Sequence, residues 1–158
     1  MSEDTIDTVN KILTEYLEKQ QQRKTSERFA ILNEIYSHDG HFDIEQLYVM
    51  MKNKKYRVSR ATLYNNIEIL LGAGLVIKHQ FGKNMAQFEK AYNYKQHDHL
   101  ICNDCGKVFE FCDPRIQQIQ KTAENMLDFE IATHSLNFFA KCNKLKATGT
   151  CINLKNNN

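Results

Sequence analysis

Apolar residues recur every three to four positions through most of the first half of the chain. This spacing is typical of amphipathic helices. It predicts helices over residues 5–19, from about residue 26, and over residues 43–52 and 59–71. Asp43 and Ser59 have the side chains that cap helix N-termini, and Gly72 and Gly74 favour an end to the last helix.

The pattern changes after Gly74. The runs "LVIKHQ" and "MAQFEKA" are strand-like and are joined by "FGKN", which predicts a hairpin. The last three of these helices, followed by a hairpin, have the order of a winged helix-turn-helix. In that arrangement the helices over 43–52 and 59–71 form the helix-turn-helix pair.

The second half of the chain mixes short strands with one helix. Two strands flank a C-x-x-C sequence, and Asp113 followed by Pro114 predicts a helix N-terminus. The segment "FEIATHSLNFFAKC" alternates like a strand. We therefore expect an α+β protein, with a winged helix-turn-helix domain over residues 1–92 and a small α+β domain over residues 93–158.

The net charge of +2 creates no strong overall field, so nucleic-acid affinity requires a local patch. No acidic residue occurs between Gln46 and Ile67, whereas five lysines and arginines do. Their place before the second helix of the pair predicts contacts with DNA, although a solvated basic loop has the same composition. Tyr64 has a partly buried core position as its alternative. The candidate DNA-binding residues are Arg28, Arg57, Ser59, Arg60, Thr62, Tyr64 and Asn65.

The stretch "QHDHLICNDCGKVFEF", residues 96–111, concentrates imidazole, carboxylate and thiol groups. The C-x-x-C lies in a predicted turn between strands, which is typical of a structural zinc site rather than of a thioredoxin-like site. Buried reduced thiols are the alternative. His97 and His99 alternate along a strand and so share a face. Nitrogen and oxygen ligands suit iron(II), manganese or zinc.

The total of five cysteines is odd, and no export signal precedes them, which argues against a disulfide framework. No apolar run is long enough to span a bilayer, so we expect a cytoplasmic protein without a membrane partner. A metalloenzyme and a metal-buffering protein are the alternatives to a DNA-binding regulator. The chain lacks HExxH, a nucleophile elbow and a phosphate loop, so we expect no enzyme.

Three segments resemble the ferric uptake regulator (Fur) family, and the resemblance covers nearly the whole chain. They are "ATLYNNIEILLGAGLV", "HDHLICNDCGKVFEF" and "THSLNFFAKC". The resemblance implies a homodimeric repressor of metal-uptake genes, with a divalent metal as corepressor. It also implies A/T-rich inverted repeats of double-stranded DNA as targets.

The resemblance implies a regulatory metal site that joins the two domains. Bound metal would set the angle between the domains, and its loss would release them. Iron(II) is the expected ion, with manganese or zinc possible. The implied ligands are His41, Glu89, His97, His99 and Glu110.

The resemblance also implies a structural zinc ion held by Cys102, Cys105 and Cys142. The fourth ligand is expected to be Cys151, which lies further from Cys142 than is usual in the family. Cys112 or a water molecule is the alternative.

Many family members have another metal site, and here the resemblance weakens. Asp98 and His134 match it, but Gln96 and Gln117 stand where the family has histidine and glutamate. Neutral amides are poor ligands for transition metals, so we expect this third site to be weak or absent. His134 would then be a hydrogen-bonded core histidine.

Two histidines, His38 and His79, have no assigned role and are expected at the surface. The "YNN" sequence resembles peroxide-sensing members of the family. Those members usually have aspartates where this chain has Glu89 and Glu110, so iron sensing is favoured. Peroxide, zinc and manganese sensing remain alternatives.

Overall fold

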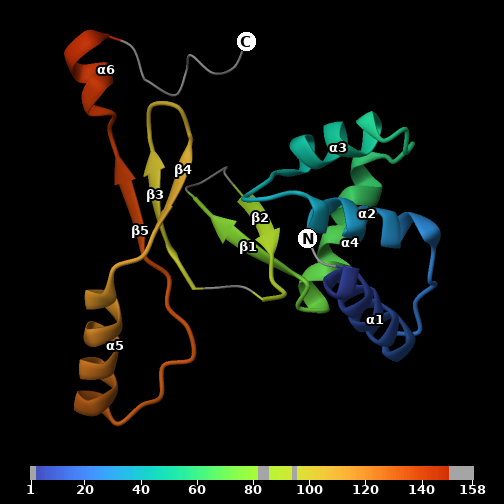
Figure 1. Ribbon diagram of the computed structural model, residues 1–158, viewed down its shortest axis with the longest axis horizontal. Coiled ribbons are helices and arrows are strands. Elements are labelled where there is room, and N and C mark those ends of the chain that lie inside the picture. The colour runs from blue at the N-terminus through green and yellow to red at the C-terminus, as the bar shows by residue number, and fades with distance from the viewer. Residues whose placement is uncertain (1–2, 82–85, 94–95, 150–158) are drawn as a thin grey trace. The chain divides into compact units, whose positions relative to one another are not determined.

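The computed structural model describes residues 3–81, 86–93 and 96–149. The chain divides into two compact units, Met1–Tyr94 and Lys95–Asn158 (Figure 1). Within the described ranges, no helix is both long and apolar enough to cross a membrane.

Unit 1 contains the helices predicted from the apolar spacing. The caps follow the sequence: Asp43 forms a capping box with Gln46, and the Ser59 hydroxyl accepts a hydrogen bond from the Thr62 amide. These caps begin the two helices of the helix-turn-helix pair where they were expected. The four helices are α1 (Glu3–Lys19), α2 (Ser26–Ser37), α3 (Ile44–Asn53) and α4 (Arg60–Gly72).

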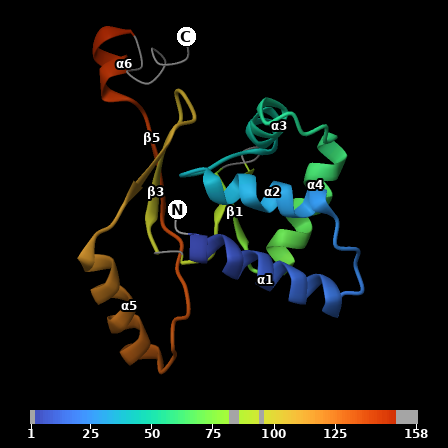
Figure 2. The same ribbon diagram turned by 45° about the vertical axis from the view of Figure 1, so that its right-hand side comes forward.

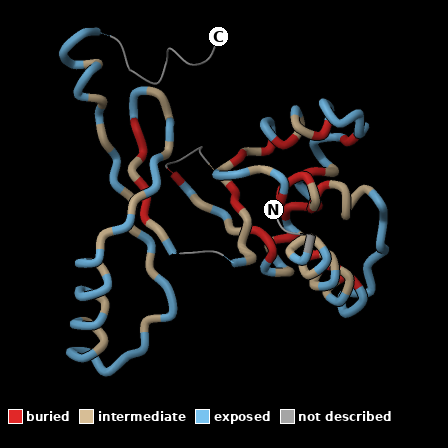
Figure 3. Tube along the Cα trace, in the orientation of Figure 1, coloured by how far each residue is buried: buried red, intermediate tan, exposed pale blue. Residues whose placement is uncertain are grey.

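The apolar stripes of the four helices meet in one core, which Figure 3 shows as the buried segments of unit 1. α1 packs closely on the end of α4. A Cβ atom at Gly72 would lie 2.2 Å from the Tyr16 hydroxyl oxygen, so a larger residue at position 72 would require the Tyr16 side chain to move. Gly74, with φ +66°, turns the chain after the helix.

The wing follows as an antiparallel hairpin of β1 (Val76–Gln80) and β2 (Ala86–Lys90). The loop before α3 adds an isolated bridge to it, because Phe42 and Phe88 exchange two backbone hydrogen bonds of 2.9 and 2.8 Å. The α+β class and the winged helix-turn-helix are therefore confirmed.

Unit 2 is built on a three-stranded sheet in the order β4-β3-β5. β3 (Asp98–Cys102) pairs antiparallel with β4 (Val108–Phe111) and parallel with β5 (Asn137–Ala140). α5 (Pro114–Leu127) and α6 (Asn143–Thr148) lie at opposite ends of this sheet (Figures 1 and 2).

Two details of unit 2 differ from the prediction. The alternation from residue 129 predicted a long strand, but β5 has only four residues, and residues 129–136 return from α5 to the sheet without strand structure. α6 was not predicted, because six residues carry too little periodicity to identify a helix.

Burial in unit 2 is concentrated on β3 (Figure 3). No described residue of α5 or α6 is buried. Large apolar side chains remain exposed on this unit: Phe109, Ile119, Met126, Leu127, Phe129, Phe138 and Phe139.

Candidate metal and DNA-binding sites

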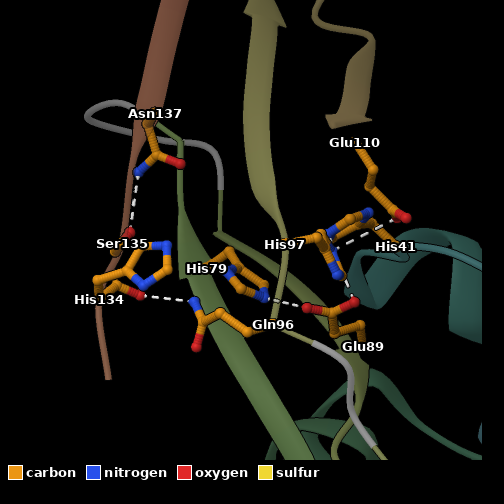
Figure 4. Close-up of polar contacts among 9 residues, drawn as sticks. All are labelled: His41, His79, Glu89, Gln96, His97, Glu110, His134, Ser135 and Asn137. Carbon is orange, nitrogen blue, oxygen red and sulfur yellow. Dashed lines mark hydrogen bonds and ion pairs between the residues drawn. The ribbon is translucent and has the colours of Figure 1, made fainter. Parts of the chain in front are cut away.

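Two histidines point toward the carboxylate of Glu89 in unit 1 (Figure 4). The Phe42–Phe88 bridge is antiparallel, so it places the preceding residue, His41, opposite Glu89. The His41 Nε2 and Glu89 Oε2 atoms are 3.7 Å apart, and Glu89 is only 6% exposed. One local backbone pairing thus brings together two of the predicted regulatory ligands.

His79 is the second histidine, and its expected surface position is wrong. In the hairpin register Ile77 pairs with Glu89, so His79 lies diagonally across on the same face. Its Nε2 contacts Glu89 Oε1 directly, and its ring stacks on Phe81 at 5.5 Å. Assigning the register of the predicted hairpin would have placed His79 beside Glu89.

His41 and His79 face different oxygens of the Glu89 carboxylate. Two atoms that each lie about 2.1 Å from one ion can be at most about 4.2 Å apart. The 3.7 Å separation between His41 and Glu89 therefore leaves space for an ion between them. His79 instead makes a direct hydrogen bond to the other oxygen, which is the kind of contact that orients a ligand carboxylate.

A second set of donors lies on one face of the sheet in unit 2. His99 pairs with Glu110 across β3 and β4, and His97 precedes β3 by one residue on the same face. The His97 Nε2 and Glu110 Oε1 atoms are 3.7 Å apart, and the two imidazole centroids are 4.8 Å apart. Two histidines and one carboxylate form a donor set that suits first-row divalent ions.

The C-x-x-C forms a tight turn between β3 and β4. The Cys102 carbonyl accepts a hydrogen bond from the Gly106 amide at 2.8 Å, and the Cys102 amide donates to the Lys107 carbonyl at 3.0 Å. The turn also reaches the end of β5, because an Asp104 carboxylate oxygen accepts from the Cys142 amide at 2.6 Å. Backbone contacts thus bring Cys142 to the turn that holds Cys102 and Cys105.

The remaining candidates for the fourth zinc ligand differ in what the structure describes. Cys151 lies outside the described residues. Cys112 follows the far end of β4, about 13 Å of strand from the turn, and its sulfur lies 3.9 Å from the Gln96 carbonyl oxygen. That position offers no support for Cys112 as a ligand beside Cys102.

The residues that match the family's third site line a pocket of about 420 Å³ in unit 2. Both imidazole nitrogens of His134 are engaged there: Nε2 is 3.0 Å from Asp98 Oδ1, and Nδ1 is 2.8 Å from Gln120 Nε2. Gln96 donates a 2.8 Å hydrogen bond to the His134 carbonyl. Gln120 was not identified from the sequence. Amides stand at two of the positions where the family has ligands, and neutral amides are poor ligands for transition metals, so the weak or absent third site stays a prediction.

The candidate DNA-binding residues are mostly exposed along α4 and the turn before it. Tyr64 is 57% exposed, which excludes the partly buried alternative, and Arg57 and Asn65 are exposed as well. The Ser59 hydroxyl caps α4 by accepting a hydrogen bond from the Thr62 amide at 3.0 Å, and the two hydroxyl oxygens lie 2.9 Å apart.

Two of the predicted DNA-binding arginines have partners within the chain. Arg28 donates to the Arg23 carbonyl at 2.7 Å. Arg60 makes two hydrogen bonds to the Glu45 carboxylate. Neither pairing was visible in the local sequence.

The sequence model of the ferric uptake regulator family matches residues 19–139. A ferric uptake regulation protein from Haemophilus ducreyi is 34% identical over 116 residues, which are 73% of this chain and 77% of that protein. The peroxide-responsive repressor PerR of Staphylococcus epidermidis is 29% identical over 133 residues, 84% of this chain and 87% of that protein.

Solved structures agree. The ferric uptake regulator from Pseudomonas aeruginosa, determined with manganese, has a TM-score of 0.71 and 31% identity, covering 83% of this chain and 98% of that one. The chain therefore belongs to the ferric uptake regulator family, whose members are dimeric DNA-binding transcription regulators and not enzymes.

Proposed function

We propose that this protein is a metal-responsive transcriptional repressor that uses iron(II) as its corepressor. The observation that carries the proposal is the pair of 3.7 Å nitrogen–oxygen separations, one between His41 and Glu89 and the other between His97 and Glu110. Each separation suits two ligands of one ion.

In this proposal one ion takes ligands from both units. His97, His99 and Glu110 supply a two-histidine, one-carboxylate set, which leaves coordination positions open. His41 and Glu89 fill those positions. The bound ion then restricts the angle between the DNA-binding unit and unit 2, so that metal shifts the population toward the conformation that binds DNA.

Ligand chemistry supports iron(II) or manganese at this site, because no thiolate is present to select zinc. The manganese in the Pseudomonas aeruginosa structure is consistent with that choice. The glutamates at positions 89 and 110 favour iron sensing over peroxide sensing within the family resemblance. Zinc remains chemically possible at the same donors.

A separate structural zinc is proposed at Cys102, Cys105, Cys142 and Cys151. The contact of Asp104 with the Cys142 amide supports three of these ligands, because it joins the end of β5 to the C-x-x-C turn. A zinc ion there would stabilise a unit whose described apolar side chains are largely exposed.

The same exposed side chains support a homodimer formed through unit 2. Phe109, Phe138 and Phe139 lie on its sheet, and Ile119 and Met126 lie on α5. Burying them against a second copy would remove apolar surface from water. Two DNA-binding units would then read an A/T-rich inverted repeat, in the cytoplasm, at metal-uptake genes.

The proposal is tested by anaerobic fluorescence anisotropy with an A/T-rich inverted-repeat duplex and a scrambled duplex. The zinc-containing protein is titrated with chelator present and then with iron(II), manganese or zinc added. Specific binding should require iron(II) or manganese, and His97→Ala should abolish it. His38→Ala, a histidine outside the proposed ligand set, is the control and should bind normally.

Metal-independent binding of the inverted repeat would contradict the proposed switch, and undiminished binding by His97→Ala would contradict the ligand assignment. The similarity to PerR motivates one further arm. If hydrogen peroxide releases the iron-loaded protein from DNA and mass spectrometry detects an oxidised ligand histidine, the peroxide-sensing alternative replaces iron sensing.

A further inference from the structure

Arg60, the first residue of α4, is held by two residues of α3. Its Nε and Nη2 groups donate to the two carboxylate oxygens of Glu45 at 2.6 and 2.7 Å. Its guanidinium carbon also lies 4.2 Å from the centre of the Tyr48 ring. A bidentate ion pair and a cation–π contact thus hold one side chain of the helix-turn-helix pair.

Helix dipoles help to explain why this arginine needs a carboxylate. The N-terminus of α4 carries partial positive charge, which disfavours a cation at its first position. Glu45 lies in the first turn of α3, where a carboxylate is favoured. The hydrogen bond from Arg60 lowers the pKa of Glu45, and the same bond raises the pKa of Arg60. Both groups are therefore charged at neutral pH.

The pair remains open to solvent, since the side chains of Arg60 and Glu45 are 53% and 62% exposed. Exposed ion pairs are weak because water and salt screen them. A DNA phosphate offers the same fork of oxygen acceptors as a carboxylate. Glu45 is also the last acidic residue before the acid-free stretch that contains the basic patch and most of α4.

We propose that Glu45 competes with DNA phosphate for Arg60. In the DNA-free protein Glu45 holds the guanidinium on α3, and a phosphate replaces the carboxylate when the protein binds DNA. Glu45 therefore lowers the affinity for DNA and acts as a residue that tunes it. This inference rests on the proposed DNA-binding function and adds a residue that the candidate DNA-binding set did not contain.

The competition predicts opposite effects for the two partners. Glu45→Gln keeps the side-chain size but removes the charge, so Arg60 becomes available and affinity should rise about three- to fivefold, as expected for loss of a weak exposed pair. Arg60→Gln should lower the affinity. It should also reduce the slope of log affinity against log salt by about 0.9, the contribution of one phosphate contact.

The experiment is a double-mutant cycle with full-length, metal-loaded protein. Wild type, Glu45→Gln, Arg60→Gln and the double variant are titrated with the inverted-repeat duplex by anisotropy, between about 50 and 200 mM salt. Glu68→Gln, the same charge change at an exposed position of α4, is the matched control. Circular dichroism melts of each variant verify that the fold is intact.

The expected result is a gain for Glu45→Gln that exceeds the gain for Glu68→Gln and disappears in the Arg60→Gln background. An equal gain in both backgrounds would overturn the inference, because it would reflect general charge repulsion. Weaker binding by Glu45→Gln would also overturn it, because the Glu45–Arg60 ion pair would then remain in the DNA complex and stabilise it.

Failure of the inference and failure of the proposed function are distinguishable in the same titrations. If wild type binds the inverted repeat but Glu45→Gln matches it in affinity and salt slope, only the inference fails. If wild type binds neither the inverted repeat nor the scrambled duplex under any metal condition, the proposed function fails and the inference with it.

Discussion

Tyr36 links the wing to the helical core of unit 1, so removal of its hydroxyl group tests how much this link stabilises the unit. The side chain belongs to α2 and is 1% exposed. Its hydroxyl donates to the Leu75 carbonyl at 2.7 Å and accepts from the Tyr92 amide at 3.1 Å. Burial raises the pKa of Tyr36, so the hydroxyl stays protonated and can donate at neutral pH.

Tyr36→Phe removes both hydrogen bonds but leaves the ring in place. The Leu75 carbonyl keeps a partner, because it also accepts from the Ala91 amide at 3.1 Å. The half-buried Tyr92 amide loses the hydroxyl that it contacts. Leaving such a donor unsatisfied costs about 1–3 kcal/mol, so we expect unit 1 to be destabilised by about 2 kcal/mol.

The assay is urea and thermal unfolding followed by far-ultraviolet circular dichroism, since the chain contains no tryptophan. A loss of about 2 kcal/mol should lower the melting temperature of a unit of this size by about 10 °C. Tyr64→Phe is the matched control, because its ring is exposed, and it should change stability by less than about 0.5 kcal/mol. If Tyr36→Phe behaves like that control, the assignment of the Tyr36 hydroxyl as a buried structural link is wrong.

Three further predictions concern the candidate metal sites. His79→Phe should weaken binding of the regulatory metal about 10- to 100-fold, measured by anaerobic manganese titration, because the ligand carboxylate loses the group that orients it. Asp104→Ala should make zinc easier to extract with a chelator, because the Cys142 amide loses its partner at the turn; release is measured with a colorimetric zinc indicator. Gln96→His combined with Gln117→Glu should add one bound divalent ion per chain by elemental analysis, because it restores ligating groups to the pocket.

The first two predictions each have a control variant, and each of the three has a contradicting outcome. His38→Phe should leave manganese affinity unchanged, and equal affinity for wild type and His79→Phe would refute the orienting role. Asp128→Asn, a change at an exposed position of unit 2, should not affect zinc release, and an unchanged rate for Asp104→Ala would refute the link. An extra ion already present in the wild-type pocket would contradict the expectation of a weak or absent third site.

Local patterns predicted most of the fold. The helices of unit 1 begin close to their predicted caps because a capping side chain and the helix it starts are only a few residues apart. The C-x-x-C turn was also predictable, because the residues that form it are close together in the chain. Two features were not predicted. The short length of β5 is set by its pairing with β3, and α6 has only six residues, too few for a recognisable pattern.

The sequence by itself determined the family, the fold class and the kinds of donor that the chain offers, because residue type and spacing specify local structure and ligand chemistry. Only the tertiary structure decided which side chains meet. The Phe42–Phe88 bridge and the hairpin register bring His41 and His79 to Glu89, and α3 brings Glu45 to Arg60. These contacts join residues that are far apart in the chain, and their pairing depends on packing and register, which no local pattern records.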